Sequence, residues 1–142
     1  MRPVLVAFVN IRPEIDSALL ELRGHAESLM PDTCTVSRAD PNGSVDPATG
    51  EPERVQVYSG PAKRQSYESY EQSPEAGGHM FAVQRYSAHF PVGSFEPAPD
   101  DVIVWTASVH DPDLPGTRDR VTGLFNKSFA TAQRVFVEEV VA

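Results

Sequence analysis

One arrangement of side chains in the sequence is suited to a metal ion. It lies at the start of DPDLPGTRDRV, residues 111–121, where Asp111 and Asp113 offer carboxylates two positions apart and His110 adds an imidazole. Such groups can bind a divalent cation together. A calcium loop, however, needs further acids at regular spacing and a closing Glu, which residues 114–119 do not supply. A metal-assisted hydrolase therefore has weak support.

The same stretch favours a stiff corner. Pro112 and Pro115 each fix their own φ, and Gly116 can adopt a positive φ. The Asp111 side chain can cap the turn. We therefore predict a structural corner without a metal ion.

No other combination of residues indicates catalysis. The sequence lacks a Gly-x-Ser-x-Gly turn, a phosphate-binding loop, a dinucleotide fingerprint and a Cys-x-x-Cys pair. Cys34 alternates with Val36 and is expected in the core. The adjacent Asp100 and Asp101 are typical of a solvated turn before a strand. We predict that the protein is not an enzyme and has no cofactor.

The charge balance argues against nucleic-acid binding. The chain has 12 Lys and Arg against 20 Asp and Glu, a net charge of -8, whereas binding to phosphates requires excess positive charge. One cysteine cannot form an intramolecular disulfide. The apolar run at residues 4–9 is too short to cross a bilayer. We expect a soluble protein made in the cytoplasm, without membrane contact.

Apolar spacing predicts one helix, at residues 13–30. Its apolar residues recur at intervals of four and three, which places them on one face. They are Ile15, Leu19, Leu22, Ala26 and Leu29. Pro13 suits the first turn, and Pro31 ends the helix.

Six short segments after the helix predict β-strands. They are residues 33–38, a segment beginning at 55, and residues 79–90, 102–109, 117–125 and 130–141. Gly- and Pro-rich turns separate them, so we predict a mainly β (α+β) fold: a small antiparallel β-barrel of about six strands with the helix packed outside. A single domain, 1–142, then comprises an arm at 1–12, the helix at 13–30 and the barrel at 33–141, with a long polar loop at 66–78.

Six segments in the same order, with similar gaps, resemble the head-to-tail stopper (head-closure) proteins of long-tailed actinobacterial phages. They are MPDTCTVSR (30–38), DPATGE (46–51), VYSGPAK (57–63), RYSAHFPV (85–92), DPDLPGTRDRV (111–121) and TAQR (131–134). The resemblance covers residues 12–140. The sequence departs from the family pattern in two places. The family commonly has Gly-Asp at the positions of Asp100 and Asp101, and a second basic residue at the position of Gln133.

The resemblance implies a structural virion protein in the phage neck. Such proteins form a ring that joins head to tail and closes the DNA channel after packaging. The implied partners are other copies of the chain, with six favoured over twelve, the head-tail adaptor above, and the tail terminator or tail tube below. Double-stranded DNA would pass without sequence-specific binding.

The family's long loop points into the channel and corresponds to residues 66–78. Its acids would repel passing DNA, and its tyrosines and glycine pair would let it fold across the bore. The implied gating residues are Tyr67, Glu68, Tyr70, Glu71, Glu75, Gly77 and Gly78.

A ring also needs apolar contacts between subunits. The strand at 102–109 is apolar on both faces, and the arm is apolar, so the candidate contacts are Val4, Leu5, Phe8 and Trp105. These residues would otherwise complete the core of their own subunit. The alternative function is a monomeric β-barrel that binds a small ligand, with Tyr58, Tyr86 and Trp105 at its mouth.

Overall fold

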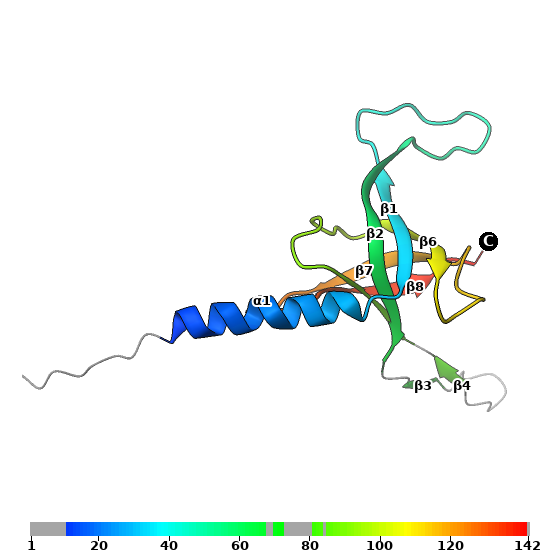
Figure 1. Cartoon of the computed structure of the whole chain (residues 1–142). Coiled ribbons are helices and arrows are strands. Elements are labelled where there is room, and N and C mark those ends of the chain that lie inside the picture. Colours follow the sequence, from blue (N-terminus) through cyan, green and yellow to red (C-terminus); the bar gives the residue numbers. More distant parts are fainter. Residues whose placement is uncertain (1–10, 68–69, 73–80, 84, 142) are drawn as a thin grey trace, which may run out of the picture.

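The computed structural model describes residues 11–67, 70–72, 81–83 and 85–141, and only the backbone of the two short segments in the middle. A helix is followed by eight strands (Figure 1). The elements are α1 (Arg12–Ser28), β1 (Asp32–Ala39), β2 (Arg54–Ser66), β3 (Tyr70–Gln72), β4 (Phe81–Val83), β5 (Tyr86–Phe90), β6 (Val102–Ser108), β7 (Arg118–Phe125) and β8 (Gln133–Glu139). No helix in these segments combines the length and apolar character that a membrane span requires.

Six of the strands close into an antiparallel barrel, which confirms the predicted fold class. Their order around the barrel is β1-β2-β5-β8-β7-β6, and β6 pairs with β1 to complete the circle. A barrel of so few strands has a narrow interior that side chains fill. Trp105, Phe90 and Ile103 are the largest side chains with no exposed surface, and Ala62 and Ala88 leave room for them.

Trp105 belongs to this core. Its side chain is 0% exposed, and its indole Nε1 donates a hydrogen bond to Asp119 Oδ2 at 2.8 Å. The prediction of a subunit contact at Trp105 is therefore wrong, because the side chain faces the interior of its own barrel. The other face of β6 carries Val102 and Val104, which are only half-buried.

A buried ion pair lies beside Trp105. Arg64 donates to both carboxylate oxygens of Asp119, from Nε to Oδ2 at 2.8 Å and from Nη2 to Oδ1 at 3.0 Å. The guanidinium also lies over the ring of Tyr86, 3.7 Å from its centroid. Asp119 has no exposed surface. This network joins β2, β5, β6 and β7 inside the barrel.

Asp101 is also buried, at 1% exposed, contrary to the predicted solvated turn. Its Oδ2 accepts hydrogen bonds from Arg38 Nη2 at 3.0 Å and from the backbone N–H of Ala98 at 2.9 Å. Its neighbour Asp100 is exposed, has φ 70°, and pairs with Arg120 at 2.8 Å. The carboxylate of Asp101 therefore fixes the turn before β6 from the inside.

The corner between β6 and β7 has the predicted structure. The Asp113 N–H donates to Asp111 Oδ1 at 3.0 Å, and Gly116 adopts φ 94°. Leu114, at the middle of the corner, is buried in the core. The two prolines and the Asp111 cap therefore hold the apolar side chain of Leu114 in the core.

The helix begins one residue before its predicted start and extends away from the barrel, with its N-terminal end farthest from it (Figure 1). None of its residues is buried. A side-chain hydrogen bond ties it to the loop before β8, from Arg23 Nε to the carbonyl of Ala130 at 2.9 Å. Of the predicted apolar stripe, Ile15, Leu19 and Ala26 are half-buried, whereas the two leucines at 22 and 29 are exposed.

Between β2 and β5 the structure differs from the predicted strand and loop boundaries. β2 continues to Ser66, and β3 pairs with β4 in a separate two-stranded sheet. The predicted strand 79–90 is therefore divided into β4 and β5. The predicted loop 66–78 holds the end of β2 and all of β3, so the described part of it is extended and paired backbone.

Candidate functional site

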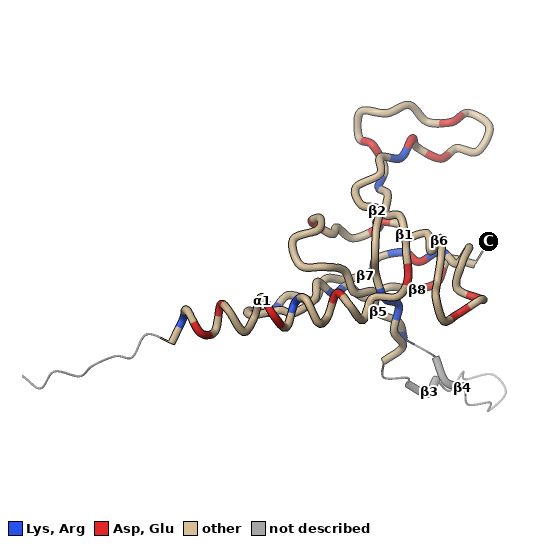
Figure 2. Tube along the Cα trace, viewed as in Figure 1, with Lys and Arg blue, Asp and Glu red and all other residues tan. Residues whose placement is uncertain are grey.

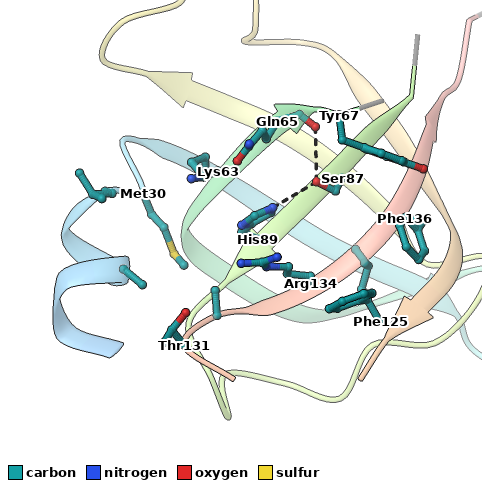
Figure 3. A pocket seen from close by; sticks show the side chains of 14 residues that line it. Met30, Lys63, Gln65, Tyr67, Ser87, His89, Phe125, Thr131, Arg134 and Phe136 are labelled. Carbon is teal, nitrogen blue, oxygen red and sulfur yellow. Dashed lines mark hydrogen bonds between the residues drawn. The ribbon is translucent and has the colours of Figure 1, made fainter. Parts of the chain in front are cut away.

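A groove of about 350 Å³ lies on the outer face of the barrel, beside the C-terminal end of α1 (Figure 3). Its floor is the outer face of β2, β5 and β8, and its walls are apolar for the most part. The lining residues are Ala26, Leu29, Met30, Lys63, Gln65, Tyr67, Ser87, His89, Phe125, Thr131, Ala132, Arg134, Val135 and Phe136. This volume is in the range of ligand pockets.

A row of three basic side chains crosses the floor. Strand pairing places His89 of β5 directly opposite Lys63 of β2 on one side and Arg134 of β8 on the other. All three residues point outward, because their strand neighbours Ala62, Ala88 and Val135 point into the core. The row exists only because three strands that are distant in the sequence lie side by side.

The groove carries positive charge without a compensating acid. None of its lining residues is Asp or Glu. Within the described parts of the chain, neither Lys63 nor Arg134 makes an ion pair. Carboxylates gather elsewhere, on the loop between β1 and β2, along α1 and at the β6–β7 corner (Figure 2). A cationic groove in a chain of net charge -8 is therefore a local feature.

His89 responds to this charge. It is 8% exposed and shares a hydrogen bond of 3.1 Å with Ser87 Oγ. Burial, with smaller contributions from the positive charges of Lys63 and Arg134, lowers the pKa of His89 from 6.5 to about 4. The imidazole is therefore neutral at pH 7, and the positive charge of the groove comes from the lysine and the arginine.

The lowered pKa makes stability depend on pH. A base whose pKa is lower in the folded state than in the unfolded state disfavours folding as it becomes protonated. We therefore expect His89→Gln to reduce the pH dependence of unfolding between pH 6.5 and 4. The free energy of unfolding of wild type should lose up to about 1.4 kcal/mol per pH unit more than that of the variant.

Urea titrations at several pH values in this range measure the difference. His25→Gln, at an exposed position on α1, is the matched control and should parallel wild type. A constant gap between wild type and His89→Gln from pH 7 to pH 4.5 would show that His89 does not titrate as described.

The groove holds one of the predicted gating residues. Tyr67 lines it, with its ring 5.6 Å from that of Phe136. Tyr70 and Glu71 lie in β3, where they pair with Val83 and Ala82, and only their backbone is described. The remaining predicted residues fall outside the described residues: Glu68, Glu75, Gly77, Gly78, Val4, Leu5 and Phe8.

The three aromatic residues of the alternative function do not form one mouth. Tyr58 donates a hydrogen bond to the Pro61 carbonyl and stacks on Phe95 at 5.1 Å. Tyr86 lies under Arg64, and Trp105 is in the core. These three side chains therefore do not line a common site, and ligand binding by the barrel stays a prediction.

The stretch considered for a metal ion holds none of the required geometry. Within the described segments, no three His, Cys, Asp or Glu side chains come close enough to bind an ion together. Cys34 is fully buried, as predicted, and burial followed by the charge of Asp32 raises the pKa of its thiol to about 12. A thiol with this pKa stays protonated and is a poor nucleophile at neutral pH.

Sequence patterns did not reveal the groove, because its basic residues come from three strands. Lys63 and Arg134 each stand on the outer face of an alternating strand, where a solvated charge is ordinary. Alternation shows that these residues lie on the outer face of their strands. It does not show that strand pairing places Lys63, His89 and Arg134 side by side.

Comparison with curated proteins and with solved structures gave no match. A family model does match, over residues 22–138, which includes every strand of the barrel except the last residue of β8. The chain therefore belongs to DUF6093, a family of unknown function.

Proposed function

We propose that this protein is a structural subunit of a phage neck, where a ring of copies joins the head to the tail and closes the DNA channel after packaging. The fold supports the proposal, because the resemblance implies a small β-barrel with an outer helix. Five of the six resembling segments contain parts of barrel strands: β1, β2, β5, β7 and β8. No catalytic role is proposed.

The exposed helix is the observation that carries the proposal. Most helices in proteins are stabilised by the packing of an apolar face and not by helix propensity alone. No residue of α1 is buried. Three apolar residues in or next to the helix are largely exposed: Ile11 at 57%, Leu22 at 52% and Leu29 at 66%. A subunit that packs this face against a neighbour would explain why one chain leaves it uncovered.

The proposed partners follow from a position in the neck. They are further copies of the chain, with six favoured over twelve, the head-tail adaptor above, and the tail terminator or tail tube below. Double-stranded DNA would pass through the ring without specific binding, which fits a net charge of -8. The segment at 66–78 would serve as the channel loop, as the resemblance implies.

Particles made without the protein test this proposal. A nonsense codon in the gene, within the phage that carries it, should yield DNA-filled heads that separate from tails and lose DNA on dilution. Supplying the wild-type protein from a plasmid should restore joined particles. Antibody against the purified chain should label the neck of wild-type virions in electron micrographs.

Joined, infectious particles that form without the protein would contradict the proposal. Absence of the protein from purified virions would contradict it as well. A monomer that retains a small ligand through purification would instead favour the alternative class of binding protein.

A further inference from the structure

An exposed apolar stripe runs along α1, next to the half-buried residues of the helix. Ile11, Ala18, Leu22 and Leu29 are exposed and recur at spacings of seven, four and seven. Residues seven positions apart return to within about 20° of the same face, so these four residues form one stripe. This spacing is typical of a helix that packs against another surface.

Two carboxylates border the stripe. Glu14 and Glu21 are also seven positions apart, and both are exposed. In the helical projection Glu14 lies about 80° and Glu21 about 100° from Leu22, both on the same side of the stripe. The stripe is therefore an apolar surface with negative charge along one side.

The groove has the complementary composition. Its walls are apolar, including Phe125 and Phe136, and its charged residues are Lys63 and Arg134. The guanidinium of Arg134 lies 5.9 Å from the ring centroid of Phe125. An apolar face with carboxylates at its border matches this groove in both polarity and charge.

The helix cannot fill the groove of its own chain with this stripe. Its C-terminal residues Ala26, Leu29 and Met30 already form one wall of the groove. A helix of 17 residues is about 26 Å long, and α1 points away from the barrel (Figure 1). The stripe from Ile11 to Leu22 is therefore available only to another molecule.

We propose that the stripe Ile11–Leu22 of one copy binds in the cationic groove of the next copy, with Glu14 and Glu21 near Lys63 and Arg134. The contact joins two different surfaces, so it is heterologous and repeats from copy to copy until a ring or a filament forms. This inference rests on the proposed function, since it supplies the contact that a neck ring requires.

Charge reversal on the two surfaces tests the contact in the full-length protein. Sedimentation velocity of wild type should show association that rises with concentration and weakens with salt. The variants Glu14→Lys/Glu21→Lys and Lys63→Glu/Arg134→Glu should each associate at least tenfold more weakly. One chain carrying all four changes should recover most of the loss, because the opposite charges again face each other.

Mixing the two double variants gives a sharper result. In an equimolar mixture each helix finds a groove of opposite charge on the other variant, so association should return although each variant alone associates weakly. Leu22→Lys should prevent association, whereas Leu20→Lys should not, because Leu20 is 73% exposed on the opposite side of the same helix. Circular dichroism before each run identifies any variant that has not folded, and Arg134→Gln is a milder replacement for the groove variant.

Several results would overturn the inference. They are a wild-type chain that stays monomeric at every concentration, a mixture that associates no more strongly than either double variant alone, and equal effects of Leu20→Lys and Leu22→Lys. Loss of association in the helix variant alone would indicate helix–helix pairing instead. The virion experiments separate this inference from the proposed function: a neck protein can fail these tests, and a self-associating protein can be absent from virions.

Discussion

Asp119→Asn is expected to lower the free energy of unfolding by about 3 kcal/mol. Asp119 is fully buried and accepts three hydrogen bonds, two from Arg64 and one from Trp105. The amide keeps the shape of the carboxylate but removes its charge, which leaves the guanidinium of Arg64 without a counter-ion at 13% side-chain exposure. Removing one partner of a buried pair costs far more than the pair contributes.

Urea unfolding followed by far-ultraviolet circular dichroism measures this effect. The matched control is Asp100→Asn, which makes the same chemical change in a pair with Arg120 that is exposed on both sides. Exposed pairs contribute little, so the control should unfold close to wild type. Equal midpoints for the two variants would mean that the network inside the barrel does not stabilise it.

Phe90→Ala is expected to cost about 4 kcal/mol of stability. Phe90 is fully buried and meets two other rings edge-on, Tyr58 with a centroid distance of 5.5 Å and Phe95 at 4.9 Å. Truncation removes the transfer free energy of the ring and leaves a cavity that a closed barrel cannot easily collapse. Both edge-on contacts are lost as well.

Thermal denaturation monitored by the fluorescence of Trp105, the single tryptophan, follows this variant. Phe129→Ala is the control, since that ring is 62% exposed, and its midpoint should stay near that of wild type. Phe90→Leu should fall between the two and remains measurable if the alanine variant does not fold. A midpoint for Phe90→Ala within a degree of wild type would contradict the described core.

Local patterns were sufficient for the elements and for the corner. Alternation predicted the six barrel strands within a few residues, with one exception. It predicted a single strand at 79–90, where the structure has two separate strands, β4 and β5. Pro13 and Pro31 bounded the helix closely, because proline acts on its own backbone. The corner at 111–116 was predicted for the same reason, since its φ values and its cap depend on adjacent residues only.

Long-range partners were not predictable in this way. Asp101 looked solvated because its partner, Arg38, is 63 positions away. Arg64 and Asp119 are 55 positions apart. A single charged residue in an alternating strand has the same local pattern whether it faces water, a groove or a buried counter-ion. Only the register of the strands distinguishes these cases, and turn chemistry alone does not set it over such distances.

The closure of the barrel affects how the chain is synthesised. β2 can pair with one edge of β1 soon after it leaves the ribosome, but the other edge pairs with β6, and Ser108 lies 76 positions beyond Asp32. At about 5–20 residues per second, this edge stays open for roughly 4–15 s of translation. An open edge is a template for pairing with another nascent chain. Neighbouring ribosomes on one messenger are therefore where this protein is most prone to aggregate, and slower initiation or a holding chaperone should raise its soluble yield.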